Sequence, residues 1–378
     1  DGPRVAGPVA RAVTNDRPDP LAVAVPAEVR LRARRYARCV AVIVYTDERF
    51  VEHETGPFHP ERPSRMSAVA DGLVLAGVDD AVVRAMARPA TDEELLRVHP
   101  EAFIRGIEQF CRSGRTDIDA DTIVSERSAE VARLGSGAGL DAIERLRAGE
   151  ADAAFVAPRP PGHHATANRA MGFCLFNHVA VAAAALAAVG ERVAIIDIDA
   201  HHGNGTQDIF YREPDVLYVS WHQHPLYPGT GMAGEVGSGA GHGATWNLPM
   251  PSGATGDHYR ASFADLVAPA VEAHGTTWVL VSAGFDAHRD DPLTDLGLTS
   301  GDYADLLLDV VSLAPAGRRL MFLEGGYDLE AIATCTAATV SALFGERLHP
   351  ERPTSGGPGS DVIERVTAVR ERIASLEP

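Results

Sequence analysis

The sequence of 378 residues predicts a single α/β domain whose central, mostly parallel β-sheet is flanked by helices on both faces. Short apolar runs are the first reason, because strands buried on both faces form continuous apolar blocks. The runs are CVAVIVY (39–45), ADAAFVAP (151–158), RVAIIDID (192–199), DVLYVSW (215–221), TWVLVSAG (277–284) and RRLMFLEGG (318–326). The second reason is that helical patterns lie between several of them, including residues 128–149 and 300–314.

The remaining segments predict the domain limits. Residues 1–40 are rich in Pro, Arg and Val, with a basic run at 30–39, and predict an extension or a loosely docked arm. The main domain is expected over 41–345. Residues 346–378 predict a linker and a final helix, which either packs on the domain or forms a dimer contact, and so allows a homo-oligomer. The apolar residues of that helix are Val362, Val366, Val369, Ile373 and Leu376.

Composition excludes several classes of function. The formal charge of −18 argues against nucleic acid as a partner, because phosphate binding needs a basic face. Every positive charge is an arginine, so Schiff-base chemistry and a Walker A lysine are excluded. The apolar run 179–189 is too short to span a bilayer and predicts a buried helix. Four cysteines without a CxxC spacing indicate a reducing, cytoplasmic location, and no segment predicts a signal peptide.

Charged and titratable residues gather where four of the runs end. His163 and His164 follow the second run, residues 197–205 end the third, Asp286 follows the fifth and Tyr327 the sixth. Ligands of open parallel α/β sheets bind beyond the carboxyl ends of the strands. The sequence therefore predicts one site at this edge of the sheet.

Three of these residues predict a catalytic metal site. Asp199, His201 and Asp286 offer two carboxylates and one imidazole, and three protein ligands leave an open position. Mixed oxygen and nitrogen ligation suits zinc, and also iron(II) or cobalt(II). The alternative is a buried Asp–His hydrogen-bond pair without a metal.

Near such a metal, the histidine pair predicts general-base chemistry. His163 and His164 follow a turn, so both can face the site from a loop, and a neutral imidazole can accept the proton of a water. Each ring needs a partner, for which Asp197 and Asn204 are the candidates. The phenol of Tyr327 can donate a hydrogen bond to a developing oxyanion.

These residues together resemble the histone deacetylase superfamily and its arginase-deacetylase fold, over residues 41–345. The matching stretches are HPERPSRM (59–66), RPPGHH (159–164), GFCLFN (172–177), DIDAHHGNGTQ (197–207), VSWHQHPLYPGTG (219–231), SAGFDAHRDDPL (282–293) and LEGGYD (323–328). HHGNGTQ and SAGFD resemble the class II branch and its bacterial relatives.

The resemblance implies catalytic roles. The three ligands would bind zinc, and His164 would be the general base and then the acid that protonates the leaving amine. His163, paired with Asp197, would act electrostatically, and Tyr327 would polarise the amide carbonyl. Asn204 stands where class I enzymes have Asp, which would leave His164 without a charged partner.

The resemblance also implies substrate and potassium sites. Phe173 and Tyr227 match the aromatic walls of the acyl-lysine tunnel, with Gly172 beside them. The usual second wall is Phe, so Tyr227 alters its polarity. Leu293 matches the gatekeeper position, where polyamine-specific relatives carry Glu. A structural potassium ion would be bound, largely through backbone carbonyls, by Asp197, Asp199, His201, Ser220 and Trp221.

The sequence thus predicts a zinc-dependent deacetylase that hydrolyses N-acetyl- or N-acyl-lysine in proteins or peptides. The closest alternative is a deacetylase of acetylpolyamines or another small N-acyl amine, and acidic rim candidates such as Glu61 favour it. A non-catalytic acyl-lysine-binding module and an arginase-like manganese enzyme are more distant hypotheses. The manganese enzyme needs more bridging carboxylates than the DIDAHH stretch (197–202) offers.

Overall fold

The computed structural model describes residues 2, 40–78 and 80–375. Residues 3–39 of the predicted N-terminal arm, which include nearly all of its length and its basic run, lie outside the described residues, and so does Leu376 of the predicted C-terminal helix. No helix among the described residues is long and apolar enough to cross a membrane.

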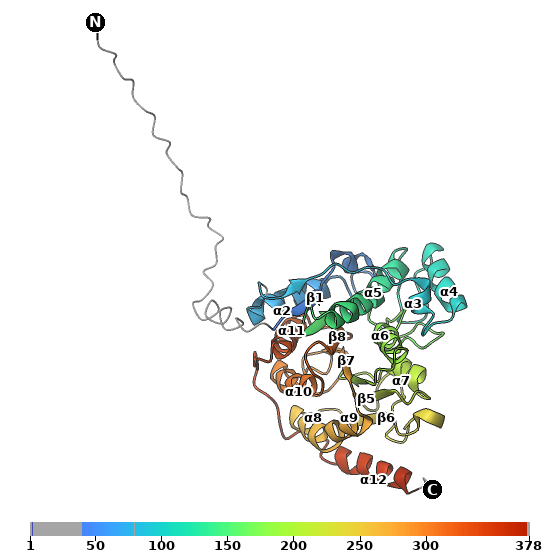
Figure 1. Ribbon diagram of the computed structural model, residues 1–378, viewed down its shortest axis with the longest axis vertical. Coiled ribbons are helices and arrows are strands. Elements are labelled where there is room, and N and C mark those ends of the chain that lie inside the picture. The colour runs from blue at the N-terminus through green and yellow to red at the C-terminus, as the bar shows by residue number, and fades with distance from the viewer. Residues whose placement is uncertain (1, 3–39, 79, 376–378) are drawn as a thin grey trace.

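An eight-stranded, all-parallel sheet forms the centre of the domain, with the strand order β2-β1-β3-β8-β7-β4-β5-β6 (Figure 1). The strands are β1 Val42–Tyr45, β2 Val83–Arg84, β3 Ala153–Val156, β4 Val193–Asp197, β5 Val216–Gln223, β6 Thr245–Met250, β7 Trp278–Ala283 and β8 Arg319–Leu323. All six apolar runs contain a strand, so the predicted parallel sheet is confirmed.

The two strands that the sequence did not predict, β2 and β6, lie at the two edges of the sheet. β2 has only two residues, and both are exposed. β6 includes Asn247 and Pro249, which interrupt an apolar run; proline is tolerated on an edge strand because one side of that strand needs no ladder hydrogen bonds. Edge strands therefore lacked the continuous apolar signal that identified the central ones.

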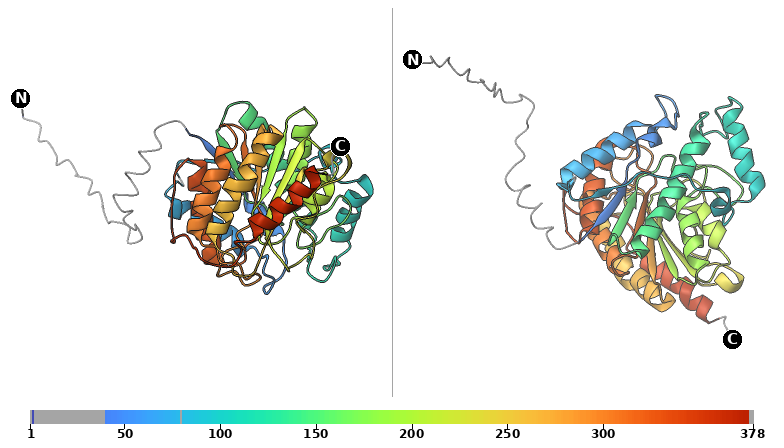
Figure 2. Two further views of the ribbon diagram at one scale, coloured as in Figure 1. Left: turned by 90° about the horizontal axis from the view of Figure 1, so that it is seen from below. Right: turned by 45° about the horizontal axis from the view of Figure 1, so that its top comes forward.

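Helices cover both faces of the sheet (Figure 2). Along β1, Val42 and Val44 join one apolar core, while Ile43 and Tyr45 join the other. The first core is covered by α2, α8, α9, α10 and α11, and the second by α5 and α6. The helices are α2 Ser64–Ala76, α3 Asp92–Leu95, α4 Glu101–Arg112, α5 Ser128–Arg147, α6 His178–Ala187, α7 Asn204–Phe210, α8 Gly256–Ser262, α9 Ala268–His274, α10 Ser300–Ser312, α11 Leu329–Leu343 and α12 Val362–Ala374. Two 3-10 helices, η1 Glu48–Glu52 and η2 Gly239–Gly241, and a π-helical segment, η3 Phe263–Val267, are also present.

The C-terminal helix α12 lies against the edge strand β6 (Figure 1). Its residues Val362 and Val366 are buried, and the guanidinium of Arg370 lies 3.7 Å from the centroid of the Trp246 ring. Arg370 also donates to the carbonyl of Thr245. The helix thus covers one edge of the sheet in the single chain, and a contact between two copies through it stays a prediction.

Candidate active site

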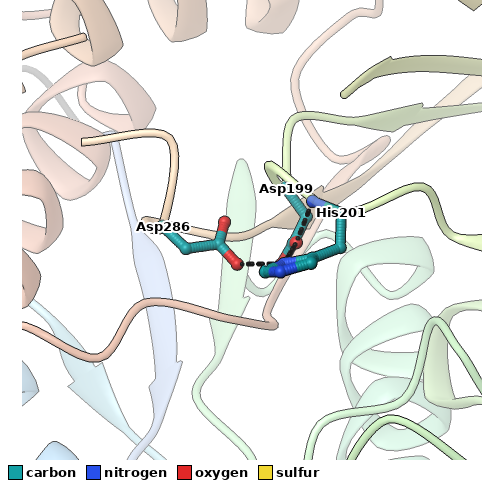
Figure 3. Close-up of side chains that lie close together, drawn as sticks. All are labelled: Asp199, His201 and Asp286. Atoms are coloured by element: carbon teal, nitrogen blue, oxygen red, sulfur yellow. Dashed lines mark hydrogen bonds and ion pairs between the residues drawn. The ribbon is translucent and has the colours of Figure 1, made fainter. Parts of the chain in front are cut away.

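The three predicted metal ligands meet at the carboxyl edge of the sheet. β4 and β7 are parallel neighbours, and Asp199 and Asp286 come shortly after their ends. His201 Nδ1 lies 2.8 Å from Asp286 Oδ2 and 3.3 Å from Asp199 Oδ1, and all three side chains are buried (Figure 3). One ligand atom from each residue lies within 4.8 Å of those from the other two. This spacing lets a single cation contact all three residues.

Backbone groups orient both carboxylates. Asp199 accepts hydrogen bonds from the amides of His201 and Gly325, each at 2.8 Å, and Asp286 accepts one from Ala200 at 2.7 Å. The glycine at 325 is required, because a Cβ there would lie 2.3 Å from Asp286 Oδ2. Both carboxylate ligands are therefore held in place by the protein's own backbone.

The electrostatics of this group favour a bound cation. Burial alone would lower the pKa of His201, but hydrogen bonds and charge from Asp199 and Asp286 raise it to about 10. Burial, and the charge of Asp199, raise the pKa of Asp286 to about 7. Two buried carboxylates thus compete for one imidazolium, and a divalent ion would supply the missing positive charge. The residues present fit a zinc-like ion.

A second group of metal-ligand type is satisfied by the protein itself. His288 Nε2 lies 2.7 Å from Glu351 Oε2, and His288 Nδ1 accepts from the amide of Asp290. Arg289 donates to the other Glu351 oxygen at 2.6 Å, and Glu351 also caps Ser300 at the start of α10. We assign this group to holding the C-terminal segment on α10.

The histidine pair lies on a loop beside the metal ligands. His163 Nδ1 lies 3.1 Å from Asp197 Oδ2, and His164 Nδ1 lies 2.8 Å from Asn204 Oδ1. Burial tends to lower the pKa of His163, but the charges of Asp199 and Asp197 raise it to about 10. Burial lowers the pKa of His164 well below its usual value, and the neighbouring His163 lowers it further. The two adjacent imidazoles therefore differ in their hydrogen-bond partner and in the direction in which their pKa is shifted.

A cavity of about 230 Å³ leads to this group. Its lining residues are Asp121, His164, Gly172, Phe173, His201, Leu226, Tyr227, Leu293 and Tyr327. The Phe173 ring lies 5.7 Å from that of Tyr327, and the Tyr227 ring lies 5.2 Å from that of His164, measured between centroids. Leu293 is 37% exposed and Tyr227 38%, so both reach the mouth. The cavity is narrow, aromatic at its walls and polar at its floor.

One wall depends on an unusual backbone. Gly172 and Phe173 both have positive φ angles, 56° and 68°. A Cβ at 172 would lie 2.5 Å from Cδ2 of His164, so only glycine leaves room for the imidazole at this position. The His59 ring packs edge-on against Phe173 with 4.7 Å between centroids. The wall formed by Gly172 and Phe173 thus packs directly against the His164 imidazole.

The residues predicted for potassium lie along two neighbouring strands. Asp197 and Ser220 are directly paired in the β4–β5 register, and Trp221 follows Ser220. The Trp221 indole donates to Ser262 at 2.9 Å. Asp199 and His201 follow the end of β4, so the structure brings all five residues to one region.

Glu61 does not lie at the rim, and the prediction that it could attract a substrate there is wrong. It is fully buried, where Arg159 donates to it at 2.5 and 2.9 Å and Arg65 at 3.2 Å. Arg65 in turn donates to the carbonyls of Glu324 and Gly326. Glu61 was expected to be exposed because charged residues seldom lie fully inside a protein unless they are paired.

The sequence alone did not point to Asp121, Leu226, Arg65 or Glu324. Arg65 and Glu324 stand within stretches that carry the resemblance, HPERPSRM and LEGGYD, which was a usable signal. Leu226 also stands within such a stretch, VSWHQHPLYPGTG, whereas Asp121 is brought to the cavity by a loop outside all of them.

The fold and the site define an α/β protein with a candidate single-metal centre at the floor of a narrow aromatic cavity. The Histone deacetylase domain family matches residues 59–343. The chain belongs to this family, and the predicted resemblance is confirmed.

Two proteins similar to this chain in sequence carry the same family name, and a solved structure has a similar fold. Histone deacetylase 15 of Arabidopsis thaliana is 39% identical over 317 residues, which cover 82% of this chain and 57% of that protein. The histone deacetylase-like amidohydrolase of Pseudomonas aeruginosa is 37% identical over 295 residues, 76% of this chain and 78% of that one. The crystal structure of the HDA15 HD domain matches with a TM-score of 0.82 at 37% identity, and covers 89% of this chain and 98% of that one. The likeness supports the arginase-deacetylase fold.

The metal assignment predicts about one zinc-like ion per chain in purified protein, measured by elemental analysis. His201→Ala should reduce bound metal to less than about a tenth, because it removes the nitrogen ligand and leaves two facing carboxylates. Asp290→Asn is the matched control, since Asp290 belongs to the second group, and it should leave the metal content unchanged. A metal-free wild-type protein that remains fully active would contradict the assignment.

Proposed function

We propose that the protein is a zinc-dependent deacetylase that hydrolyses the amide bond of N-acetyl- or N-acyl-lysine in proteins or peptides. One observation carries the proposal: His201, which belongs to the candidate metal group, lines one cavity together with His164 and Tyr327, and Phe173 and Tyr227 also line it. An extended lysyl stem fits between two aromatic rings, and its acyl group would then reach the floor. The names of the relatives, deacetylase and amidohydrolase, support the same chemistry.

Asp199, His201 and Asp286 would hold the metal, and when bound it would polarise the amide carbonyl and make a water more acidic. Zinc suits this donor set, and iron(II) also fits mixed oxygen and nitrogen ligands. Potassium, if bound near Asp197 and Ser220, would be structural.

His164 carries the proton transfers in this proposal. Its Nδ1–H donates to Asn204 Oδ1, which leaves Nε2 free to accept a proton from water. The same imidazolium then protonates the departing amine. Asn204 is neutral, so it orients the ring without adding charge, whereas His163 is paired with the carboxylate of Asp197.

Tyr327 faces the same cavity from the opposite loop. Its backbone amide donates to Asp291 at 2.7 Å, and its ring is held between Phe173 and the guanidinium of Arg65. The hydroxyl would donate to the carbonyl oxygen as negative charge develops on it.

We expect Tyr327→Phe to keep the fold and metal content while kcat falls by roughly a hundred- to a thousandfold, the usual cost of removing one oxyanion donor. Turnover of an acetyl-lysine peptide measures the loss. Tyr211→Phe, which removes a phenolic hydroxyl outside the cavity, is the control and should leave kcat unchanged. Near-normal turnover of Tyr327→Phe would remove the tyrosine from the mechanism.

His164→Ala should reduce kcat more than His163→Ala, because His164 lines the cavity whereas His163 faces Asp197. Only the general base has to move a proton twice. Rates of both variants with the same peptide, at equal metal content, decide the order. Equal losses, or the reverse order, would show that the two roles are assigned wrongly.

A second candidate function is the deacetylation of acetylpolyamines. Asp121 lines the cavity, and its carboxylate could attract a substrate ammonium group. Leu293 at the mouth favours the peptide instead, because an apolar side chain packs on a lysyl stem and cannot pair with an internal ammonium.

We therefore expect acetyl-lysine peptides to exceed N8-acetylspermidine in kcat/KM by at least about tenfold, roughly 1.4 kcal/mol. Leu293→Glu should narrow this ratio, whereas Leu96→Glu, outside the cavity lining, should not. A rate screen over acyl-lysine peptides and acetylpolyamines measures both effects. Faster hydrolysis of the polyamine would favour the second function, and binding without any hydrolysis would indicate a recognition module.

A further inference from the structure

A buried carboxylate that the proposed chemistry does not use lies directly behind the histidine loop. Glu324 follows β8 and is fully buried. Its Oε2 accepts hydrogen bonds from the backbone amides of Gly162 at 2.7 Å and His163 at 3.0 Å. Its Oε1 accepts from Ser282 Oγ at 3.2 Å. One side chain thus satisfies two consecutive amides of the loop that carries the proposed base.

Glu324 thus holds the amide side of the backbone immediately before His164. Asn204 orients the imidazole, and the loop carbonyls have partners of their own. The Thr206 amide donates to the His163 carbonyl at 3.1 Å, and Asn177 Nδ2 donates to the Ala165 carbonyl at 3.1 Å. Gly172 lies so close to the ring that even a Cβ there would lie 2.5 Å from it. A small shift of the loop would therefore move the imidazole against this wall or away from the cavity floor.

The backbone of the same residue holds the opposite side of the site. The carbonyls of Glu324 and Gly326 accept from Arg65 at 2.5 and 2.7 Å, and the amide of Gly325 donates to Asp199 at 2.8 Å. Tyr327 follows directly. Glu324 therefore joins the histidine loop, a candidate metal ligand and the tyrosine loop within one short segment.

We propose that Glu324 is a positioning residue. By accepting the Gly162 and His163 amides, its carboxylate sets the distance between the His164 imidazole and the substrate carbonyl to which Tyr327 would donate. The catalytic part of this inference rests on the proposed function, because it takes His164 as the base.

Position and charge can be separated at this residue. A glutamine keeps the chain length and an oxygen that can accept both amides, but it removes the charge. An aspartate keeps the charge, but its oxygens end about 1.5 Å short, the length of one C–C bond. If Glu324 acts by position, Glu324→Gln should resemble the wild type and Glu324→Asp should not. If it acts by charge on His163, the order reverses.

The experiment measures kcat, KM and metal content for both variants with an acetyl-lysine peptide. We expect Glu324→Gln to stay within about threefold of the wild-type kcat and Glu324→Asp to lose about tenfold or more, since small misplacements of a catalytic group are costly. KM and metal content should change little in either. Equal rates in the two variants, or a slower Glu324→Gln, would overturn the inference.

Amide hydrogen exchange gives a readout that does not depend on activity. The amides of residues 162 and 163 should be protected in the wild type and in Glu324→Gln, and exchange faster in Glu324→Asp. Unchanged protection in Glu324→Asp would contradict the anchor itself. Failure of the wild type to hydrolyse any acyl substrate would instead contradict the proposed function, so the two failures are distinguishable.

Discussion

Two like charges buried side by side constrain this site more than any other feature. Asp199 and Asp286 follow neighbouring parallel strands, and their carboxylates both approach Nδ1 of the His201 imidazole. Such a pair is unfavourable in a low-dielectric interior unless a cation neutralises it. Backbone amides hold both carboxylates in this arrangement, and the absence of a side chain at Gly325 leaves room for them.

Close packing determines where the histidine loop can lie. Gly172 lets His164 lie against the cavity wall, and the cavity floor is shared by His164, His201 and Tyr327. Neutral Asn204 and anionic Asp197 then give two adjacent imidazoles different environments. A difference in the partners is enough to separate a proton-transfer role from an electrostatic one.

Behind the site lies a second buried charge system, which reaches the cavity at the ring of Tyr327. Although burial opposes its ionisation, the guanidinium of Arg159 and its other neighbours hold the pKa of Glu61 well below its usual value. Arg65 connects this system to the carbonyls beside Tyr327. Breaking a buried pair of this kind by removing one partner typically costs about 3–5 kcal/mol. The pairs of Glu61 with Arg159 and Arg65 therefore stabilise the loop that carries Tyr327.

The sequence by itself determined the parallel sheet, its six apolar strands, the family and the residues that gather at the strand ends, because apolar runs and strand-end side chains are local signals. Only the tertiary structure decided the two edge strands, because β2 is short and exposed and Asn247 and Pro249 interrupt the apolar run of β6. It also decided that Glu61 is buried, that Asp121 enters the cavity and that Glu324 turns toward the histidine loop. Each of these depends on which distant segment packs beside the residue, and residue type alone does not carry that information.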